Sequence, residues 1–155
     1  MSRPQVGVTH NSVVIAAPLP LVWEISNDLC RWTELFDEYQ NVEILSRQQD
    51  TVRFRLTMHP DENGTVWSWV SERTPDPGTF TVEASRVEPG PFEYMRILWS
   101  YRTVEAGTEM TWTQKFHMRP DAPVDDAAMT DRINTNTPIQ MQRFKAAIEH
   151  AAALV

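Results

Sequence analysis

A segment rich in tryptophan ends in an arginine near the middle of the chain. Residues 65–73 read Thr-Val-Trp-Ser-Trp-Val-Ser-Glu-Arg, and a β-strand here would place Trp67, Trp69, Ser71 and Arg73 on one face. If that face points inward, burying the Arg73 guanidinium costs folding free energy unless oxygen atoms of a carboxylate or a ligand compensate. The pattern therefore makes Arg73 a candidate for binding oxygen atoms. An exposed face, on which Trp69 and Arg73 form a cation–π pair, explains the spacing equally well.

Two later segments repeat this arrangement of large apolar side chains on one face of a strand. The residues on these faces are Met95, Ile97, Trp99 and Tyr101 in one segment and Met110, Trp112, Gln114 and Phe116 in the other. Gln114 differs from its neighbours, because a buried amide needs hydrogen-bond partners. Gln114 is therefore a candidate pocket residue, although a structural hydrogen bond would account for it too. His117 falls on the opposite, polar face, which indicates a surface histidine rather than a catalytic one.

The remaining reactive residues form no known catalytic or metal-binding motif. The four histidines have no ligand spacing, and Cys30, as the single cysteine, excludes an internal disulfide and a cysteine-based metal site. A nucleophile elbow, a glycine-rich phosphate loop and a zinc-binding His-Glu-x-x-His motif are all missing from the sequence. The five glycines lie in or beside predicted turns, so none is left to hold a pyrophosphate. The sequence thus predicts neither a metal ion nor a nucleotide cofactor.

Length and composition narrow the class of protein. The 155 residues correspond to one domain over residues 1–155, because chains divide into several domains only beyond roughly 250 residues. A formal net charge of -7 argues against a nucleic-acid partner, since phosphates require clustered basic residues. No apolar run has the roughly 18 residues needed to cross a bilayer, and the N-terminus lacks a signal-peptide core, so we expect a cytoplasmic protein without membrane contact. Six tryptophans exceed the need of a small core, and several are expected to line a cavity.

The elements that must position these side chains follow from periodicity and turn residues. Residues Val6–Ile15 alternate and meet a proline turn, which predicts a strand. Residues Leu19–Phe36 carry apolar side chains three and four apart, with a break and helix cap at Asn27-Asp28, and predict two short helices. Short, turn-forming connections then separate six further strands, which indicates an antiparallel meander rather than a parallel sheet. The six predicted strands are Val42–Arg47, Thr51–His59, Thr65–Arg73, Thr79–Val87, Phe92–Val104 and Thr108–Met118.

A long helix is predicted to close the domain. Residues Asp125–Val155 carry apolar side chains at helical spacing, and Asp125 and Asp126 suit the N-terminus of a helix. Pro138 should bend or break this helix, since proline removes a backbone hydrogen bond, and a short separate helix before it is the alternative. We therefore expect an α+β fold in which a strongly curved, antiparallel sheet wraps around the C-terminal helix.

Five segments distributed along the chain match a known family. They are Ala17-Pro-Leu-Pro-Leu-Val-Trp23-Glu-Ile-Ser-Asn27-Asp28, Trp32-x-x-Leu-Phe36-x-x-Tyr39, Val66-Trp-Ser-Trp-Val-Ser-Glu-Arg73, Gly90-Pro-Phe-x-Tyr-Met95 and Gly107-Thr-Glu-Met110. Together they resemble the single-domain polyketide aromatase/cyclases of the tetracenomycin and spore-pigment type, over essentially the whole chain. The resemblance implies the helix-grip fold of the START/Bet v 1-like superfamily, in which seven antiparallel strands curl around a long C-terminal helix and enclose a deep pocket.

The resemblance also implies an activity and a set of site residues. The protein would fold a poly-β-ketone and direct its first aldol ring closure, between carbons 9 and 14, followed by dehydration and aromatisation without a cofactor. Arg73 would be the central catalytic group and Tyr39 a proton donor or relay. Gln140 stands where the tetracenomycin relative has an asparagine, beside Pro138. The residues expected to bind the substrate are Trp32, Met58, Trp67, Trp69, Ser71, Met95, Trp99, Gln114 and Gln140.

The chemistry of an aldol closure is consistent with these roles. A permanently protonated guanidinium such as Arg73 can hold a developing oxyanion through several donors. A phenol such as Tyr39 can pass a proton to the nascent alkoxide. A cavity that holds a flexible chain in one reactive conformer can lower the barrier by up to roughly 7–11 kcal/mol.

The implied partners are the acyl carrier protein that bears the substrate and the ketosynthase of a type II polyketide synthase. Carrier proteins are usually acidic and this chain is net negative, so docking requires a local basic surface, for which Arg31 and Arg47 are candidates. Two other functions also fit. A non-catalytic carrier of a lipid or another apolar ligand has little use for an inward Arg73, and a heterodimerising partner would have a filled cavity and an exposed apolar patch.

Overall fold

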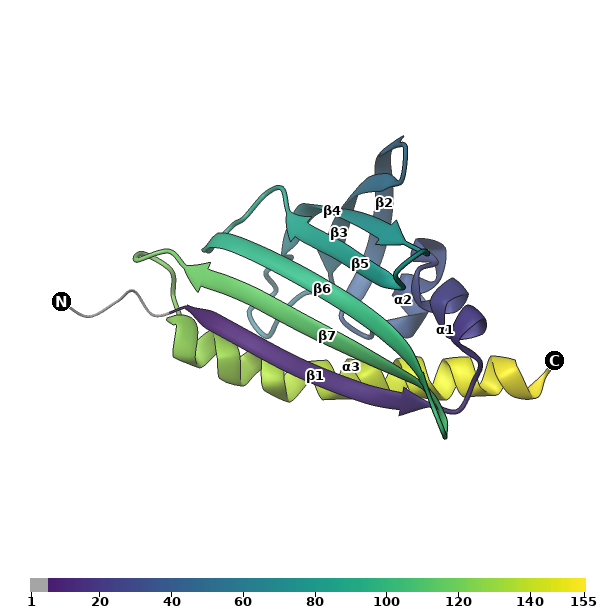
Figure 1. Ribbon diagram of the computed structural model, residues 1–155. Coiled ribbons are helices and arrows are strands. Elements are labelled where there is room, and N and C mark those ends of the chain that lie inside the picture. Colours follow the sequence, from purple (N-terminus) through teal and green to yellow (C-terminus); the bar gives the residue numbers. More distant parts are fainter. Residues whose placement is uncertain (1–5) are drawn as a thin grey trace.

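The elements occur in the predicted order of one strand, short helices, six strands and a long C-terminal helix (Figure 1). The computed structural model describes residues 6–155, so residues 1–5, which the predicted domain includes, lie outside the described residues. The strands are β1 (Gly7–Ile15), β2 (Tyr39–Gln48), β3 (Thr51–Met58), β4 (Ser68–Asp76), β5 (Thr81–Arg86), β6 (Phe92–Val104) and β7 (Gly107–Met118). The helices are α1 (Leu19–Ser26), the 3-10 turn η1 (Leu29–Arg31), α2 (Trp32–Leu35) and α3 (Asp126–Ala153).

The strands form one antiparallel sheet in the order β1-β7-β6-β5-β4-β3-β2. Consecutive strands pair from β2 to β7, and β1 pairs with β7 at the opposite edge from β2. Shifts of register within the β2–β3 and β6–β7 pairs are of the kind that bends a sheet and increases its twist. The sheet curls above α3, which runs beside β1, while α1 and α2 lie near the C-terminal half of α3 (Figure 1). This arrangement is the helix-grip fold, and it confirms the predicted fold class.

Strand β4 begins three residues later than the alternation predicts. The predicted segment Thr65–Arg73 includes part of the preceding loop, which Asp61 organises. One carboxylate oxygen of Asp61 accepts hydrogen bonds from the backbone nitrogens of Asn63 and Thr65, both at 2.9 Å. The other accepts a hydrogen bond from the Trp67 Nε1 at 3.0 Å. These bonds hold residues 61–67 as a loop, so Trp67 does not continue the alternating face of the strand.

Helix α3 begins at a cap and continues through Pro138. The Asp125 carboxylate accepts a hydrogen bond at 2.8 Å from a backbone N–H of the first turn, as predicted. The predicted break at Pro138 does not occur, because Met141, Phe144 and Ile148 behind it are fully buried and their packing outweighs one lost hydrogen bond. No helix within residues 6–155 combines the length and apolarity that crossing a membrane requires.

Buried apolar side chains form two clusters between the sheet and the helices. The larger cluster contains Trp32, Trp99, Trp112 and Phe144 and joins α1, α2 and α3 to the sheet. The smaller cluster lies where β7 ends and α3 begins, and its members are Phe92, Met95, Phe116, Met118 and Met129. Ile97 packs against both clusters, so the interior is continuous from one end of the sheet to the other.

His117 is not the freely solvated histidine that its place on the polar face suggests. Its side chain is only 24% exposed, and its Nδ1 lies 2.7 Å from a carboxylate oxygen of Asp126. The other oxygen of Asp126 accepts a hydrogen bond from the Met118 backbone nitrogen at 2.7 Å. His117 and Asp126 therefore connect the end of β7 to the first turn of α3. Strand alternation could not show that the helix returns to this edge of the sheet.

Candidate active site

Arg73 is buried in the middle of β4 and has one hydrogen-bond partner among residues 6–155. The residue is 3% exposed, and its Nη2 donates a hydrogen bond of 2.7 Å to the Asn27 Oδ1. Its guanidinium carbon lies 4.8 Å from the ring centres of both Trp32 and Trp99. The Nε and Nη1 donors are buried without any partner. Of the two orientations that the spacing allowed, the structure shows the inward one, and two donor nitrogens of Arg73 remain for a ligand.

Burial changes the proton affinity of this guanidinium without removing its charge. Desolvation lowers the pKa of Arg73 to about 10, and the nearby Tyr101 acts in the opposite direction. At neutral pH, Arg73 is therefore still a cation. A buried cation that lacks a carboxylate partner attracts partial or full negative charge on oxygen more strongly than the same group does in water.

A polar network lies behind Arg73. The Ser26 Oγ and the Tyr101 hydroxyl are 2.7 Å apart, and both groups are buried. Asn27, which follows α1, donates from its Nδ2 to the Trp23 carbonyl at 2.9 Å while its Oδ1 accepts from Arg73. Burial raises the pKa of Tyr101 to about 12, so its phenol is neutral at physiological pH and can only donate a proton. Asn27 thus fixes one edge of the guanidinium and leaves the other edge free.

A second inward-facing arginine, Arg86, lies half-buried on the neighbouring strand β5. Its guanidinium carbon is 4.0 Å from the ring centre of Trp69 and 4.7 Å from that of Phe92. Burial lowers the pKa of Arg86 to about 10, while the phenol of Tyr39 favours its charged form. Arg86 is not among the site residues predicted from the sequence. The signal was present, because Val82, Ala84 and Arg86 alternate on β5 and the first of them is fully buried.

Tyr39 was predicted to pass protons in the reaction at Arg73, but the positively charged group that acts on its phenol is Arg86. Its ring stacks on that of Trp32 with 6.5 Å between centres and meets the ring of Trp69 edge-on at 6.1 Å. Burial raises the pKa of Tyr39 above its ordinary value, and the charge of Arg86 offsets part of that rise. Trp32 contacts both Tyr39 and Arg73, so one indole separates the phenol from the inner guanidinium.

Most of the other predicted site residues face the same interior. Ser71 is buried on β4 beside Phe54 of β3 and Arg86 of β5. Met58 pairs with Tyr39 across β2 and β3 and is half-buried. Gln114 is also half-buried, and its alternation with buried Trp112 and Phe116 on β7 points it inward. Met95 belongs to the smaller apolar cluster at the far end of the sheet.

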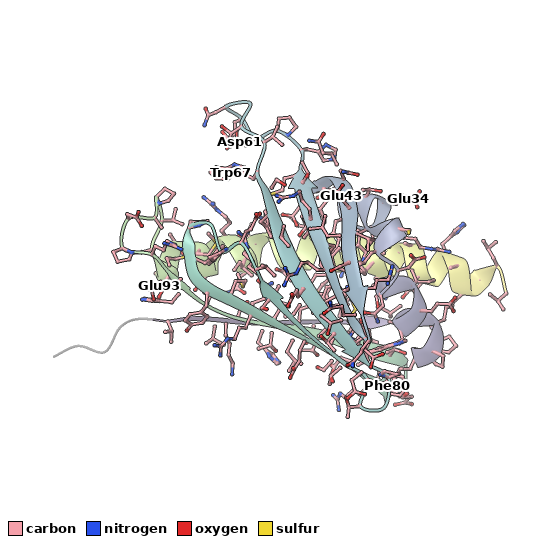
Figure 2. The ribbon with its side chains drawn as sticks, turned by 90° about the horizontal axis from the view of Figure 1, so that it is seen from above. Glu34, Glu43, Asp61, Trp67, Phe80 and Glu93 are labelled. Carbon is pink, nitrogen blue, oxygen red and sulfur yellow. The ribbon has the colours of Figure 1, made fainter. Side chains whose placement is uncertain are left out.

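Two predicted binding residues do not join this group. Trp67 is 49% exposed and lies beside Asp61 at the tip of the connection between β3 and β4, away from the interior (Figure 2). Gln140 is buried, but its amide is engaged by Asp37, whose backbone nitrogen donates to Oε1 at 3.1 Å and whose carboxylate accepts from Nε2 at 2.7 Å. Gln140 therefore anchors α3 to the turn before Tyr39. Spacing alone could not reveal either hydrogen-bond partner.

Aromatic rings occupy much of the interior beside Arg73. The rings of Trp99 and Trp112 stack with 4.3 Å between their centres, and Phe144 packs edge-on against both. Two shallower hollows lie at the surface, one of ≈ 180 Å³ on the outer face of β3 and β4 and one of ≈ 520 Å³ where β7 meets α3. Three residues on the inner face of the sheet are nevertheless only half-buried. They are Ala84, Ile97 and Gln114. These inward-facing positions therefore retain exposed surface that a substrate can reach.

Fold and site together define a helix-grip protein with a buried cation among tryptophans. The family described as polyketide cyclase / dehydrase and lipid transport matches residues 15–145. A protein of Streptomyces cyaneus that is named as a polyketide cyclase is 61% identical over 94% of this chain and 96% of its own length. The actinorhodin polyketide synthase bifunctional cyclase/dehydratase of Streptomyces coelicolor is 31% identical over 83% of this chain, which spans 39% of that protein.

The solved structures agree on the fold. The Zhui aromatase/cyclase from a Streptomyces species superposes with a TM-score of 0.77 and 22% identity, covering 96% of this chain and 94% of that one. The chain belongs to the polyketide cyclase family, and it is an enzyme of the polyketide cyclase type within it.

Proposed function

We propose that this enzyme directs the regiospecific first-ring closure, dehydration and aromatisation of a poly-β-ketone in aromatic, type II polyketide biosynthesis. The ring would close between carbons 9 and 14 of a chain carried by an acyl carrier protein. The observation that supports this most strongly is Arg73, a buried cation with two unpartnered donors among tryptophan rings. Flat indole surfaces suit the planar, conjugated product, while the free donors suit oxygen atoms that acquire charge.

The reaction needs an oxyanion stabiliser and a proton donor. Water accepts a proton from a methylene between two ketones, the resulting carbanion bonds to a distant ketone carbon, and that ketone oxygen becomes an alkoxide. The Nε and Nη1 of Arg73 can hold the enolate oxygen and then the alkoxide. The alkoxide is then protonated to a hydroxyl. This hydroxyl and a proton of the adjacent carbon leave together as water, which forms the double bond. Arg73 thus lowers the barrier through charge stabilisation, without being consumed.

Two neutral phenols are placed to supply or relay the proton. Tyr101 lies in the network behind Arg73, hydrogen-bonded to Ser26. Tyr39 lies on the far side of Trp32, beside Arg86. The position of Tyr39 suits substrate oxygens nearer to Arg86 better than those at Arg73. We therefore assign Tyr39 and Arg86 to a second point of contact with the chain.

The second candidate function is the carriage of a lipid or another apolar ligand, which the description of the family includes. The buried Arg73, together with the half-buried Arg86, favours catalysis, since desolvation of a cation costs free energy that an apolar ligand would not repay. The acyl carrier protein and a ketosynthase are the proposed partners. Of the two proposed docking residues, Arg47 is exposed, and Arg31 is partly neutralised by Asp28 at 3.4 Å.

Reconstitution with a minimal type II polyketide synthase tests this proposal. Malonyl thioester is supplied with the wild type, Arg73→Ala or Arg73→Lys, and the aromatic products are resolved by chromatography and mass spectrometry. The wild type should redirect the products to one ring pattern. Both variants should return the mixture towards spontaneous products, because lysine lacks the planar fork of donors. An unchanged profile with the wild type, together with an apolar ligand that co-purifies, would establish the carrier function instead.

A further inference from the structure

Three buried side chains of the described residues carry polar atoms without a hydrogen-bond partner. They are Arg73 at Nε and Nη1, Trp112 at Nε1 and Thr9 at Oγ1. All three are nearly inaccessible, with exposed fractions of 3%, 3% and 2%. Folded proteins pair the great majority of buried polar groups, so each exception calls for a reason. The proposed reaction gives a reason for Arg73, but none so far for Thr9 on β1.

The register of the sheet places Thr9 in one transverse row with Arg73. Arg73 of β4 pairs with Ala84 of β5, and Ala84 pairs with Ile97 of β6. Ile97 pairs with Gln114 of β7, and Gln114 pairs with Thr9 of β1. We call these five residues the Arg73–Thr9 row. Because paired residues of neighbouring strands lie on the same face of a sheet, all five share the inner face.

The side chains in the middle of this row are smaller than those in the neighbouring row. Ala84 has the smallest side chain of the five, and both Ala84 and Ile97 are half-buried. The neighbouring row contains Trp99 and Trp112, which pair across β6 and β7 and stack face to face. The stacked indoles form a wall along one side of the Arg73–Thr9 row. A flat chain can lie against this wall and cross the strands above Ala84 and Ile97.

We propose that Thr9, with Gln114, is a further oxygen-binding point, separate from Arg73 and from Tyr39 and Arg86, that selects how the polyketone is folded. Strands lie about 4.8 Å apart, so the four strand spacings from Arg73 to Thr9 span up to about 19 Å along the sheet. A poly-β-ketone carries a carbonyl on every second carbon and can reach both ends of the row. The Thr9 hydroxyl donates to a distal ketone while Arg73 holds the reacting oxygen. Thr9 is thus a specificity-determining residue, and this inference rests on the proposed function.

The test compares Thr9→Val, which keeps the shape of the side chain, with Thr9→Ser, which keeps the hydroxyl. In the reconstituted synthase, Thr9→Val should lower the ratio of the regiospecific product to the spontaneous products by about tenfold, the equivalent of one hydrogen bond. Total polyketide output should not change, and Thr9→Ser should behave like the wild type. The urea midpoint of Thr9→Val should rise, because a buried hydroxyl without a partner has been removed.

The outcomes separate this inference from the proposed function. If the wild type redirects products, Arg73→Ala does not, and Thr9→Val keeps the wild-type ratio, the role of Thr9 is wrong and the cyclase stands. If the wild type itself redirects nothing, the proposed function fails and this inference fails with it. A lower urea midpoint for Thr9→Val would indicate that the hydroxyl stabilises the fold. If the hydroxyl has only this structural role, Thr9→Ala should give the product ratio of the wild type.

Discussion

At the scale of single residues, the site depends on a cation that the protein leaves partly unpaired. Asn27 satisfies one donor of Arg73, while two others remain buried and free. An amide provides orientation without neutralising the charge, whereas a carboxylate would do both. Asn27 is therefore a positioning residue. Replacing its neutral amide with a carboxylate should move the stability of the fold and the activity of the enzyme in opposite directions.

Asn27→Asp should stabilise the fold and impair the enzyme. The new carboxylate would lie about where the amide oxygen now accepts its 2.7 Å hydrogen bond from Arg73, and would form a buried ion pair. We expect the urea midpoint to stay level or rise and the rate of ring closure to fall roughly tenfold or more, since the guanidinium charge is compensated. Asn27→Ser is the control, with a free guanidinium and a less stable fold. Full activity in Asn27→Asp would show that the free charge of Arg73 is unimportant.

Tyr101→Phe should change the pH dependence of stability above pH 10. Burial raises the pKa of Tyr101 from 10.0 to about 12, so between these values the unfolded chain loses the phenol proton while the folded chain keeps it. The wild type therefore loses stability with rising pH, by up to about 1.4 kcal/mol per pH unit from this group. Below pH 10 the wild type should be more stable by about 1 kcal/mol through its bond to Ser26.

Urea unfolding at a series of pH values measures this difference. The advantage of the wild type over Tyr101→Phe should be constant below pH 10 and shrink as the pH approaches 12. Phenolate absorbance should lose one step near pH 12 in the variant. A constant difference up to pH 12 would mean that Tyr101 is solvated rather than buried.

At the scale of elements, a glycine in the β6–β7 turn allows the end of β1 to approach this turn closely. Gly107 opens β7 with a φ of 141°, and a Cβ there would lie 2.1 Å from the Ile15 carbonyl oxygen at the end of β1. The backbone of β1 thus approaches the β6–β7 turn more closely than any side chain permits. Gly64, with a φ of 79°, has no atom within 4 Å of its Cβ position. The two glycines therefore separate the effect of backbone strain from that of a steric clash.

Gly107→Ala should destabilise the protein much more than Gly64→Ala. The strain of a positive φ alone costs about 1–2 kcal/mol, which is the expected loss for Gly64→Ala. Gly107→Ala adds a clash with backbone that cannot rotate away, and its loss in unfolding free energy should be at least about twice as large. Denaturant unfolding of both variants measures the comparison. Equal losses would mean that β1 can move away from the turn at little cost.

At the scale of the whole molecule, the buried charge lowers stability for the sake of function. Arg73→Leu should raise the unfolding free energy by about 1–3 kcal/mol, because a desolvated cation is replaced by an apolar side chain. Burial lowers the pKa of Arg73 to about 10, so above this pH the unfolded wild type binds more protons than the folded protein, and wild-type stability rises there with pH. The advantage of Arg73→Leu should be constant below pH 10 and shrink above it. A variant less stable than the wild type at neutral pH would contradict this cost.

The sequence by itself determined the order of the elements, the α+β class and the placement of Trp69, Ser71 and Arg73 on one face of a strand, whereas the structure decided that this face points inward. These properties follow from local periodicity, since side chains of a strand alternate between faces and turn residues limit each strand. The early part of β4 was predicted wrongly, because the side chain of Asp61 organises a loop where alternation continues in the sequence.

Only the tertiary structure decided which groups meet. Asn27 and Arg73 are 46 positions apart, and Gln140 and Asp37 are 103 apart, so no local pattern records either hydrogen bond. Thr9 and Arg73 share one row only because of the register of five strands. A shift by one residue in any of these strands would turn its side chain in the row to the other face of the sheet. Local spacing determines the face of each residue, and long-range strand pairing determines its neighbours.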